Sequence, residues 1–119
     1  MTYKDEIGAP ANCIRTVLTA GVLNHTLAGS ENYSPEAYKF SKFVDESLKR
    51  FMNKDWGNCD DSDNQLNNEA IEALEAGEYG RPLASYISKD WSIPRIWITQ
   101  EIVGELGEQA ITVLFPSEY

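Results

Sequence analysis

The segment from Ser34 to Gly57 carries the strongest folding signal in this chain of 119 residues. Ser34 can cap a helix, and Pro35 suits the first helical position because its missing N–H needs no partner there. Apolar residues then recur at spacings of three and four, which predicts an amphipathic helix of about five turns that ends at Gly57. The predicted buried stripe comprises Ala37, Phe40, Val44, Leu48 and Phe51, widened by Phe43 and Met52. Such a stripe needs a second apolar layer to pack against.

Strand patterns before and after this helix indicate what the second layer is. Residues 14–18 are β-branched and alternate, and residues 83–88, 95–99 and 110–115 alternate or are apolar throughout. Consecutive strands that are joined by short loops pair antiparallel. The predicted class is α+β, with a small antiparallel sheet (the N-terminal strand plus three C-terminal strands) and about three helices packed on one face.

Two further helices are predicted between the first strand and the later ones. Thr19 is the expected N-cap of a short helix that stops at Gly29. Another helix is expected from about residue 63 to residue 76, where Gly77 ends it. Its predicted buried stripe is Leu66, Ala70, Ala73 and Leu74, with Ile71 at the margin. We expect residues 1–119 to form a single domain with residues 1–12 as a loose lead-in.

The acidic residues are unevenly placed. The net charge is −9, and such a field repels nucleic acid and attracts basic surfaces. Residues 55–78 contain no Lys or Arg, whereas residues 39–54 hold half of all the bases. Glu69, Glu72 and Glu75 recur at every third position, which predicts a solvent-facing acidic ridge. The acidic and basic stretches can instead face each other across a helix pair, so both interpretations stay open.

The sequence contains no pattern typical of an active site or a metal site. His25 has no serine or cysteine at a spacing that supports a catalytic dyad. The two cysteines, Cys13 and Cys59, are expected to be free thiols, and they do not form a zinc-binding spacing with His25. Acids from Asp61 onward match calcium-loop spacing, but Leu66 stands where that loop needs glycine. We therefore predict no enzyme activity, no cofactor and no metal.

The tryptophans are the remaining contact candidates. Trp97 lies between Ile96 and Ile98, so it is expected on the open face of the sheet. Trp91 is expected in an exposed loop, whereas Trp56 is expected to fold back on the preceding helix. The predicted partner-binding residues are Asp60, Asp61, Asp63, Glu69, Glu72, Glu75, Glu78, Trp91 and Trp97.

Several motifs resemble a known family. They are residues 17–23, Asp55-Trp56-Gly57, Asp63 with residues 67–70, residues 83–86, Ile96-Trp97-Ile98-Thr99 and residues 112–119. In order and spacing, residues 14–119 are similar to small proteins of phages, plasmids and integrative elements labelled "plasmid-related protein", which also carry the label "type I restriction endonuclease subunit M". Residues 100–109 depart from that pattern, because they replace a tight turn that contains arginine, and the segment between residues 20 and 40 is longer. A methyltransferase is excluded, because its Gly-rich loop and Pro-Pro motif are missing.

The resemblance implies a mobile-element origin and a bacterial host cell. We predict a non-enzymatic cytoplasmic binding protein whose acidic face inhibits a host defence nucleoprotein, in the manner of anti-CRISPR or anti-restriction proteins. The expected partner is a basic protein surface such as a nucleic-acid-binding groove, with no direct nucleic acid and no membrane contact, since no apolar run approaches the ~20 residues of a membrane span. The alternative is a structural or regulatory accessory protein that self-associates through its sheet, as a homodimer for example, and has no defence role.

Overall fold

The computed structural model describes residues 14–29 and 34–119. The order of elements is the predicted one, and the α+β class is confirmed. The elements are β1 (Ile14–Leu18), α1 (Ala20–His25), the 3-10 turn η2 (Leu27–Gly29), α2 (Pro35–Met52), α3 (Asp61–Glu75), β2 (Leu83–Tyr86), β3 (Ile96–Ile102), β4 (Gln109–Leu114) and the 3-10 turn η3 (Pro116–Glu118).

The four strands form one sheet in the order β1-β4-β3-β2. The last three strands pair antiparallel as predicted, with Ile98 opposite both Ala84 and Val113. The first strand differs from the prediction, because β1 joins β4 in parallel, with Thr16 opposite Ile111. Three helices separate β1 from the later strands, and a long helical connection allows parallel pairing, whereas short loops do not. The sheet is therefore mixed.

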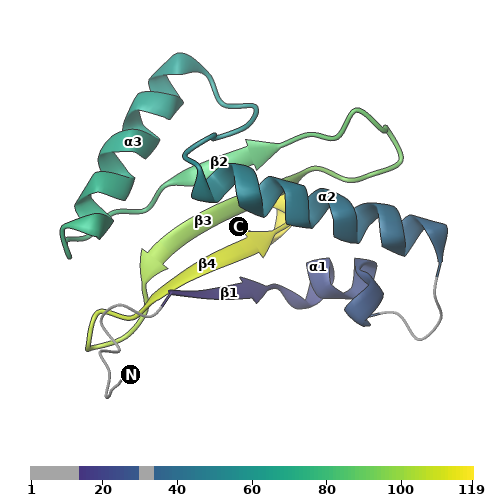
Figure 1. Cartoon of the computed structure of the whole chain (residues 1–119), viewed down its shortest axis with the longest axis horizontal. Helices are drawn as coiled ribbons and strands as arrows, with labels where there is room; N and C mark the ends of the chain where they lie inside the picture. Colours follow the sequence, from purple (N-terminus) through teal and green to yellow (C-terminus); the bar gives the residue numbers. More distant parts are fainter. Residues whose placement is uncertain (1–13, 30–33) are drawn as a thin grey trace.

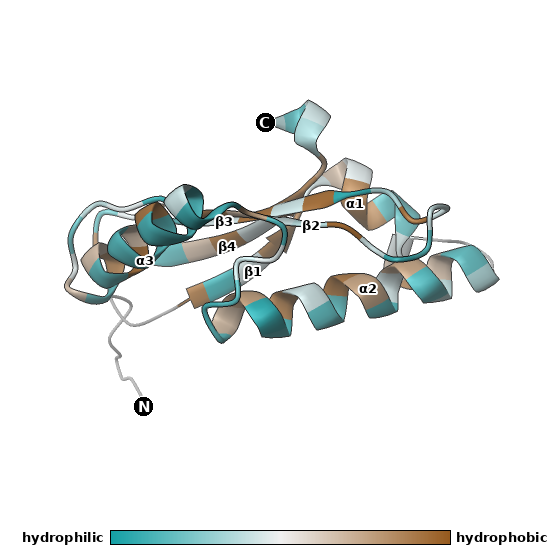
Figure 2. Ribbon diagram, turned by 90° about the horizontal axis from the view of Figure 1, so that it is seen from above, coloured by the Kyte–Doolittle hydropathy of each residue, from teal (hydrophilic) through white to brown (hydrophobic). Residues whose placement is uncertain are grey.

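The helices lie around the sheet at three different places. Figures 1 and 2 show α2 across one face of the sheet, α3 beyond the β2 edge, and α1 past the end of β1 and β4. Ser34 and Thr19 cap α2 and α1 as predicted, since their side chains accept from the N–H of Ala37 and Val22. The helix α2 ends at Met52, five residues before the predicted stop at Gly57, and Lys54, two residues after that end, takes the left-handed conformation.

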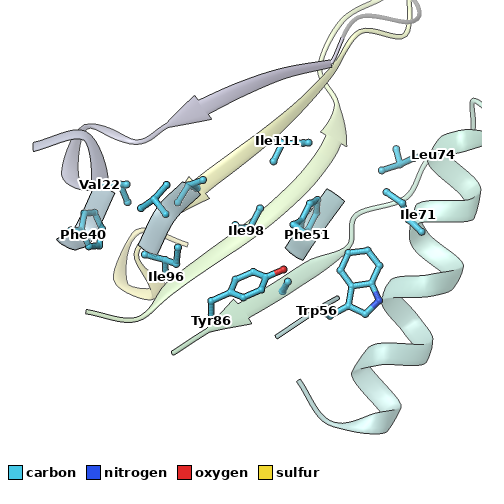
Figure 3. Packing of buried hydrophobic residues seen from close by; sticks show 13 residues of the cluster. Val22, Phe40, Phe51, Trp56, Ile71, Leu74, Tyr86, Ile96, Ile98 and Ile111 are labelled. Carbon is cyan, nitrogen blue, oxygen red and sulfur yellow. The ribbon is translucent and has the colours of Figure 1, made fainter. Parts of the chain in front are cut away.

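The core lies between α2, α3 and one face of the sheet (Figure 3). Ile96, Ile98 and Val113 face the helices, as the strand alternation predicts. The buried hydrophobic cluster is Val22, Phe40, Val44, Phe51, Trp56, Ile71, Leu74, Ala84, Tyr86, Ile96, Ile98, Ile111 and Val113. In α2 the sequence prediction was wrong at Met52, which is exposed, whereas Leu48 packs half-buried against the core and the small Ser47 is fully buried.

The buried stripe of α3 also differs from the prediction. Leu66 is 60% exposed, and Asn67 takes the inward position beside Ile71 and Leu74. The reason is polar: the Asn67 amide donates to the carbonyl of Leu83 and accepts from the Leu83 N–H, both at 2.9 Å. These two bonds pair the outer side of β2 with a side chain, and they fix the rotation of α3 about its axis.

The Asp55-Trp56-Gly57 motif completes the same edge of the sheet. The N–H of Ser85 donates to the carbonyl of Trp56 at 3.4 Å, and the Asn58 N–H donates to the carbonyl of Ser85 at 2.6 Å. Gly57 has φ 73°, and a Cβ there would stand 2.2 Å from the Ser85 carbonyl oxygen, so this close approach requires glycine. Trp56 folds back on α2 as predicted, with its ring edge-on to Phe51 at 5.2 Å.

The buried Tyr86 phenol makes the stability of the fold dependent on pH in the alkaline range. Its side chain is buried, and its hydroxyl donates to the Asp55 carbonyl at 2.7 Å. Burial raises the pKa of Tyr86 above its ordinary value of about 10. Because the folded state favours the neutral phenol, this contribution to stability is complete below about pH 10 and is lost as the pH rises further.

We therefore expect the urea midpoint of the wild-type protein to fall above about pH 10. Tyr86→Phe should be less stable by about 1 kcal/mol at pH 7, since it loses a hydrogen bond, and its midpoint should decline less steeply in alkali. Equal slopes for the two proteins would contradict this assignment.

Candidate binding surface

The exposed side of α3 carries the acidic ridge, which consists of Glu69, Glu72 and Glu75. Glu69 and Glu72 project away from the buried Ile71 and Leu74, and neither forms an ion pair within residues 14–29 and 34–119. Glu75 is different, because Lys54 stands 3.4 Å from its carboxylate. The free part of the ridge is therefore Glu69 and Glu72.

The two interpretations of the charge pattern each hold in part. Arg50 and Lys54, at the end of the basic stretch, pair with acids of the stretch that follows, namely Asp55 at 2.8 Å and Glu75. The hydrogen bond from Arg50 lowers the pKa of Asp55. The Lys54–Glu75 pair links the end of α2 to α3, Asp55 pairs within the segment that follows α2, and Glu69 and Glu72 on α3 remain exposed to solvent.

The other predicted acids lie at the two ends of α3. Asp60 is the N-cap, and its carboxylate accepts from the Asp63 N–H at 2.8 Å. Asp61 and Asp63 lie in the first turn, where the helix dipole favours negative charge. This arrangement accounts for their presence without a bound cation, and the calcium-like spacing falls on helix as expected.

An apolar strip runs beside the ridge, and the sequence prediction had assigned it to the buried side of the helix. Leu66, Ala70 and Ala73 share one side of α3 at spacings of four and three. The chain folds back along this side, because the Glu78 N–H donates to the Ala73 carbonyl at 2.8 Å. The next residue, Tyr79, is 76% exposed. The site therefore combines free carboxylates with exposed apolar groups.

The signal for this strip is ambiguous in the sequence. Asn67, Ile71 and Leu74 repeat at spacings of four and three, and so do Leu66, Ala70 and Ala73. The two stripes differ mainly in bulk, and the bulkier pair Ile71 and Leu74 could have been weighted over the two alanines. The partner that decides the choice, the backbone of Leu83, lies 16 residues from Asn67 along the chain.

Trp91 lies apart from the acidic ridge. Both views place α3 at one end of the molecule and the loop between β2 and β3 at the other (Figures 1 and 2). Trp91 is 100% exposed in this loop, where the Asp90 carboxylate accepts from the Ser92 N–H at 2.9 Å and so fixes a turn. Lys39 of α2 lies 3.8 Å from Asp90. The predicted binding residues therefore do not form a single surface.

Trp97 lies on the face opposite Ile96 and Ile98, as predicted. Its ring meets Tyr119 edge-on at 5.4 Å, and the Arg81 guanidinium stands 5.0 Å from the Tyr119 ring centre. Figure 2 shows η3 on the side of the sheet away from α2. Trp97 is thus half-buried in the packing of the C-terminal turn.

The remaining candidates are single side chains. His25 is exposed beside Phe40 and Phe115, with ring centres at 5.7 and 5.1 Å. Burial raises the pKa of the Cys59 thiol, and Cys13 lies outside the described residues. In the described part of the chain, no three His, Cys, Asp or Glu residues are placed to hold a metal ion. The helices there include none with the length and hydropathy to cross a membrane.

A groove of about 710 Å³ opens between the ends of α2 and α3 and the sheet. Apolar side chains dominate its lining, and Gln100 donates to Gln109 at 2.6 Å within it. The charged residues among its lining are Lys54 and Glu75, which pair with each other. The described lining therefore offers shape and apolar contact, but no unpaired acid or base.

We compared the chain with protein-family models, curated proteins and solved structures, and no match was found. The resemblance to mobile-element proteins accordingly stays a prediction from the sequence.

Proposed function

We propose that this protein is a non-enzymatic binding protein of phage or plasmid origin that inhibits a host defence nucleoprotein through the exposed side of α3. The observation that carries the proposal is the pair Glu69 and Glu72, which are exposed and have no cationic partner in the described chain. Exposed Leu66 lies on the neighbouring side of the same helix, and exposed Tyr79 follows the end of that helix. The mobile-element origin rests on the sequence resemblance alone.

The chemistry of this surface favours a basic protein partner. Free carboxylates one turn apart on a helix present negative charge at fixed spacing, and a charged face accelerates the encounter with an oppositely charged one. Leu66 and Tyr79 add apolar area of the kind that forms the dry centre of an interface. A nucleic-acid-binding groove offers such a partner, and occupation of that groove would exclude DNA or RNA.

The proposal is tested by competition. Purified CRISPR effector complexes and type I restriction complexes would be titrated with this protein, and their DNA binding would be measured at two salt concentrations. We expect DNA binding by one of these complexes to be lost, and added DNA to compete with the inhibitor. Undiminished DNA binding across the panel would contradict a defence role.

The contribution of the ridge is tested by the double variant Glu69→Gln/Glu72→Gln. Association with the inhibited complex should slow by about tenfold at low salt, and the difference should shrink as salt rises. Glutamine keeps the helix propensity, so the fold should persist. The matched control is Asp45→Asn/Glu46→Gln, which removes the same charge from exposed positions on α2. Equal slowing by both variants would indicate a net-charge effect and not a contact at α3.

A further inference from the structure

The two edges of the sheet differ in whether their outward backbone groups are hydrogen-bonded. At the β2 edge, backbone groups of Leu83, Ser85 and Ile87 are bonded by Asn67, by Trp56 and by Asn58. At the β1 edge, no backbone or side-chain hydrogen bond to the outer side of the strand comes from residues 14–29 or 34–119. Figure 1 shows β1 at the margin of the sheet, on the side away from α3.

The parallel ladder defines which groups of β1 point outward. The N–H of Thr19 donates to the carbonyl of Val113, and ladder bonds alternate along a strand. Val17 and Arg15 therefore bond to β4, while the N–H and C=O groups of Ile14, Thr16 and Leu18 point away from it. Three residues thus present both a donor and an acceptor at the outer edge.

The side chains of β1 give this edge little protection. Ile14 is 55% exposed and Val17 is 42% exposed. Edge strands that stay unpaired usually carry Pro, charged residues or a bulge, and Ile-Arg-Thr-Val-Leu has only one of these features, the charged Arg15. This edge has the features of a strand that pairs with another strand.

We propose that β1 pairs antiparallel with β1 of a second copy, about a twofold axis at Thr16, to join two four-stranded sheets into one. In this register Thr16 faces Thr16 of the second copy, and Ile14 faces Leu18. Ile14, Thr16 and Leu18 are the residues whose backbone groups point outward, so each of the pairs that they form exchanges both of its hydrogen bonds. The pairing is isologous, as a closed dimer requires.

The charge pattern of β1 allows a second copy as the occupant. The single charged residue of the strand, Arg15, falls opposite Val17, so no like charges meet directly. Glu69 and Glu72, the part of the acidic ridge that is unpaired in the described chain, lie on α3 toward the β2 side of the sheet, so the dimer places them away from the shared edge. The pairing does not depend on the proposed function, and it leaves both α3 surfaces free.

The test uses the residue on the axis. Thr16→Lys and Thr16→Glu each place two like charges opposite one another, and Thr16 is exposed, so both variants should fold. Sedimentation equilibrium should give the wild-type chain twice its mass of 13.4 kDa, and each variant alone should give 13.4 kDa. An equimolar mixture of the two variants should recover the doubled mass, because opposite charges then meet on the axis.

The control is Leu66→Lys, which adds a charge on α3 and should remain dimeric. Thermal melts by circular dichroism would verify that each variant is folded. A wild-type chain that stays monomeric from micromolar to millimolar concentration would overturn the proposal. Dimers that persist in both Thr16 variants would overturn it as well, because a different surface would then hold the copies together.

Discussion

Replacing Trp56 by alanine should lower the free energy of unfolding by about 3–5 kcal/mol. Trp56 is only 3% exposed, its ring packs edge-on against Phe51, and its indole N–H donates to Asn68 at 2.8 Å. The truncation removes a large apolar contact and leaves a cavity between α2 and α3. It also loosens the segment that bonds to Ser85 at the β2 edge.

The chain offers a matched control for this prediction. Trp91→Ala makes the same chemical change at a fully exposed position, so its effect should stay within about 0.5 kcal/mol. Urea unfolding followed by circular dichroism would measure both variants. A loss below 1 kcal/mol on replacing Trp56 would show that the Asp55-Trp56-Gly57 segment is not part of the core.

Replacing Asn67 by alanine should cost about 2–4 kcal/mol, since two backbone groups of Leu83 lose their partner. The predicted cost is large for a polar residue because Asn67 is buried and fixes both the β2 edge and the rotation of α3. Hydrogen exchange at the Leu83 amide should accelerate in this variant, which a purely local helix effect would not produce.

Gln65→Ala is the control, because Gln65 is exposed on the same helix and its side-chain amide donates to the Glu69 carboxylate at 3.4 Å. Its effect should be within about 0.5 kcal/mol. Equal stabilities for the Asn67 and Gln65 variants would contradict the role assigned to Asn67.

The candidate surface was predictable only in outline. The Glu69, Glu72 and Glu75 spacing follows from helix periodicity, so a ridge could be predicted from the residues alone. The neutralisation of Glu75 by Lys54 could not, because the two residues are 21 positions apart and meet only when α2 and α3 pack. The separation of Trp91 from the ridge likewise depends on where the β2–β3 loop lies.

What the sequence determined by itself was local. Capping by Thr19 and Ser34, the order of helices and strands, and the opposite facing of Trp97 and Ile98 all depend on residues within one or two turns of each other. Their physical causes are backbone hydrogen bonding and the periods of helix and strand, which act whatever the rest of the chain does.

Only the tertiary structure decided the direction of β1 and the inward face of α3. Thr16 pairs with Ile111, and Asn67 bonds to Leu83, through contacts between segments that no local pattern links. In both cases a backbone group needed a partner at the edge of a strand, and burial made an unmet bond costly. Because Asn67 bonds to Leu83, Leu66 faces solvent despite its apolar side chain. The same bonds satisfy backbone groups at the β2 edge, whereas β1 remains the outer strand at the other edge.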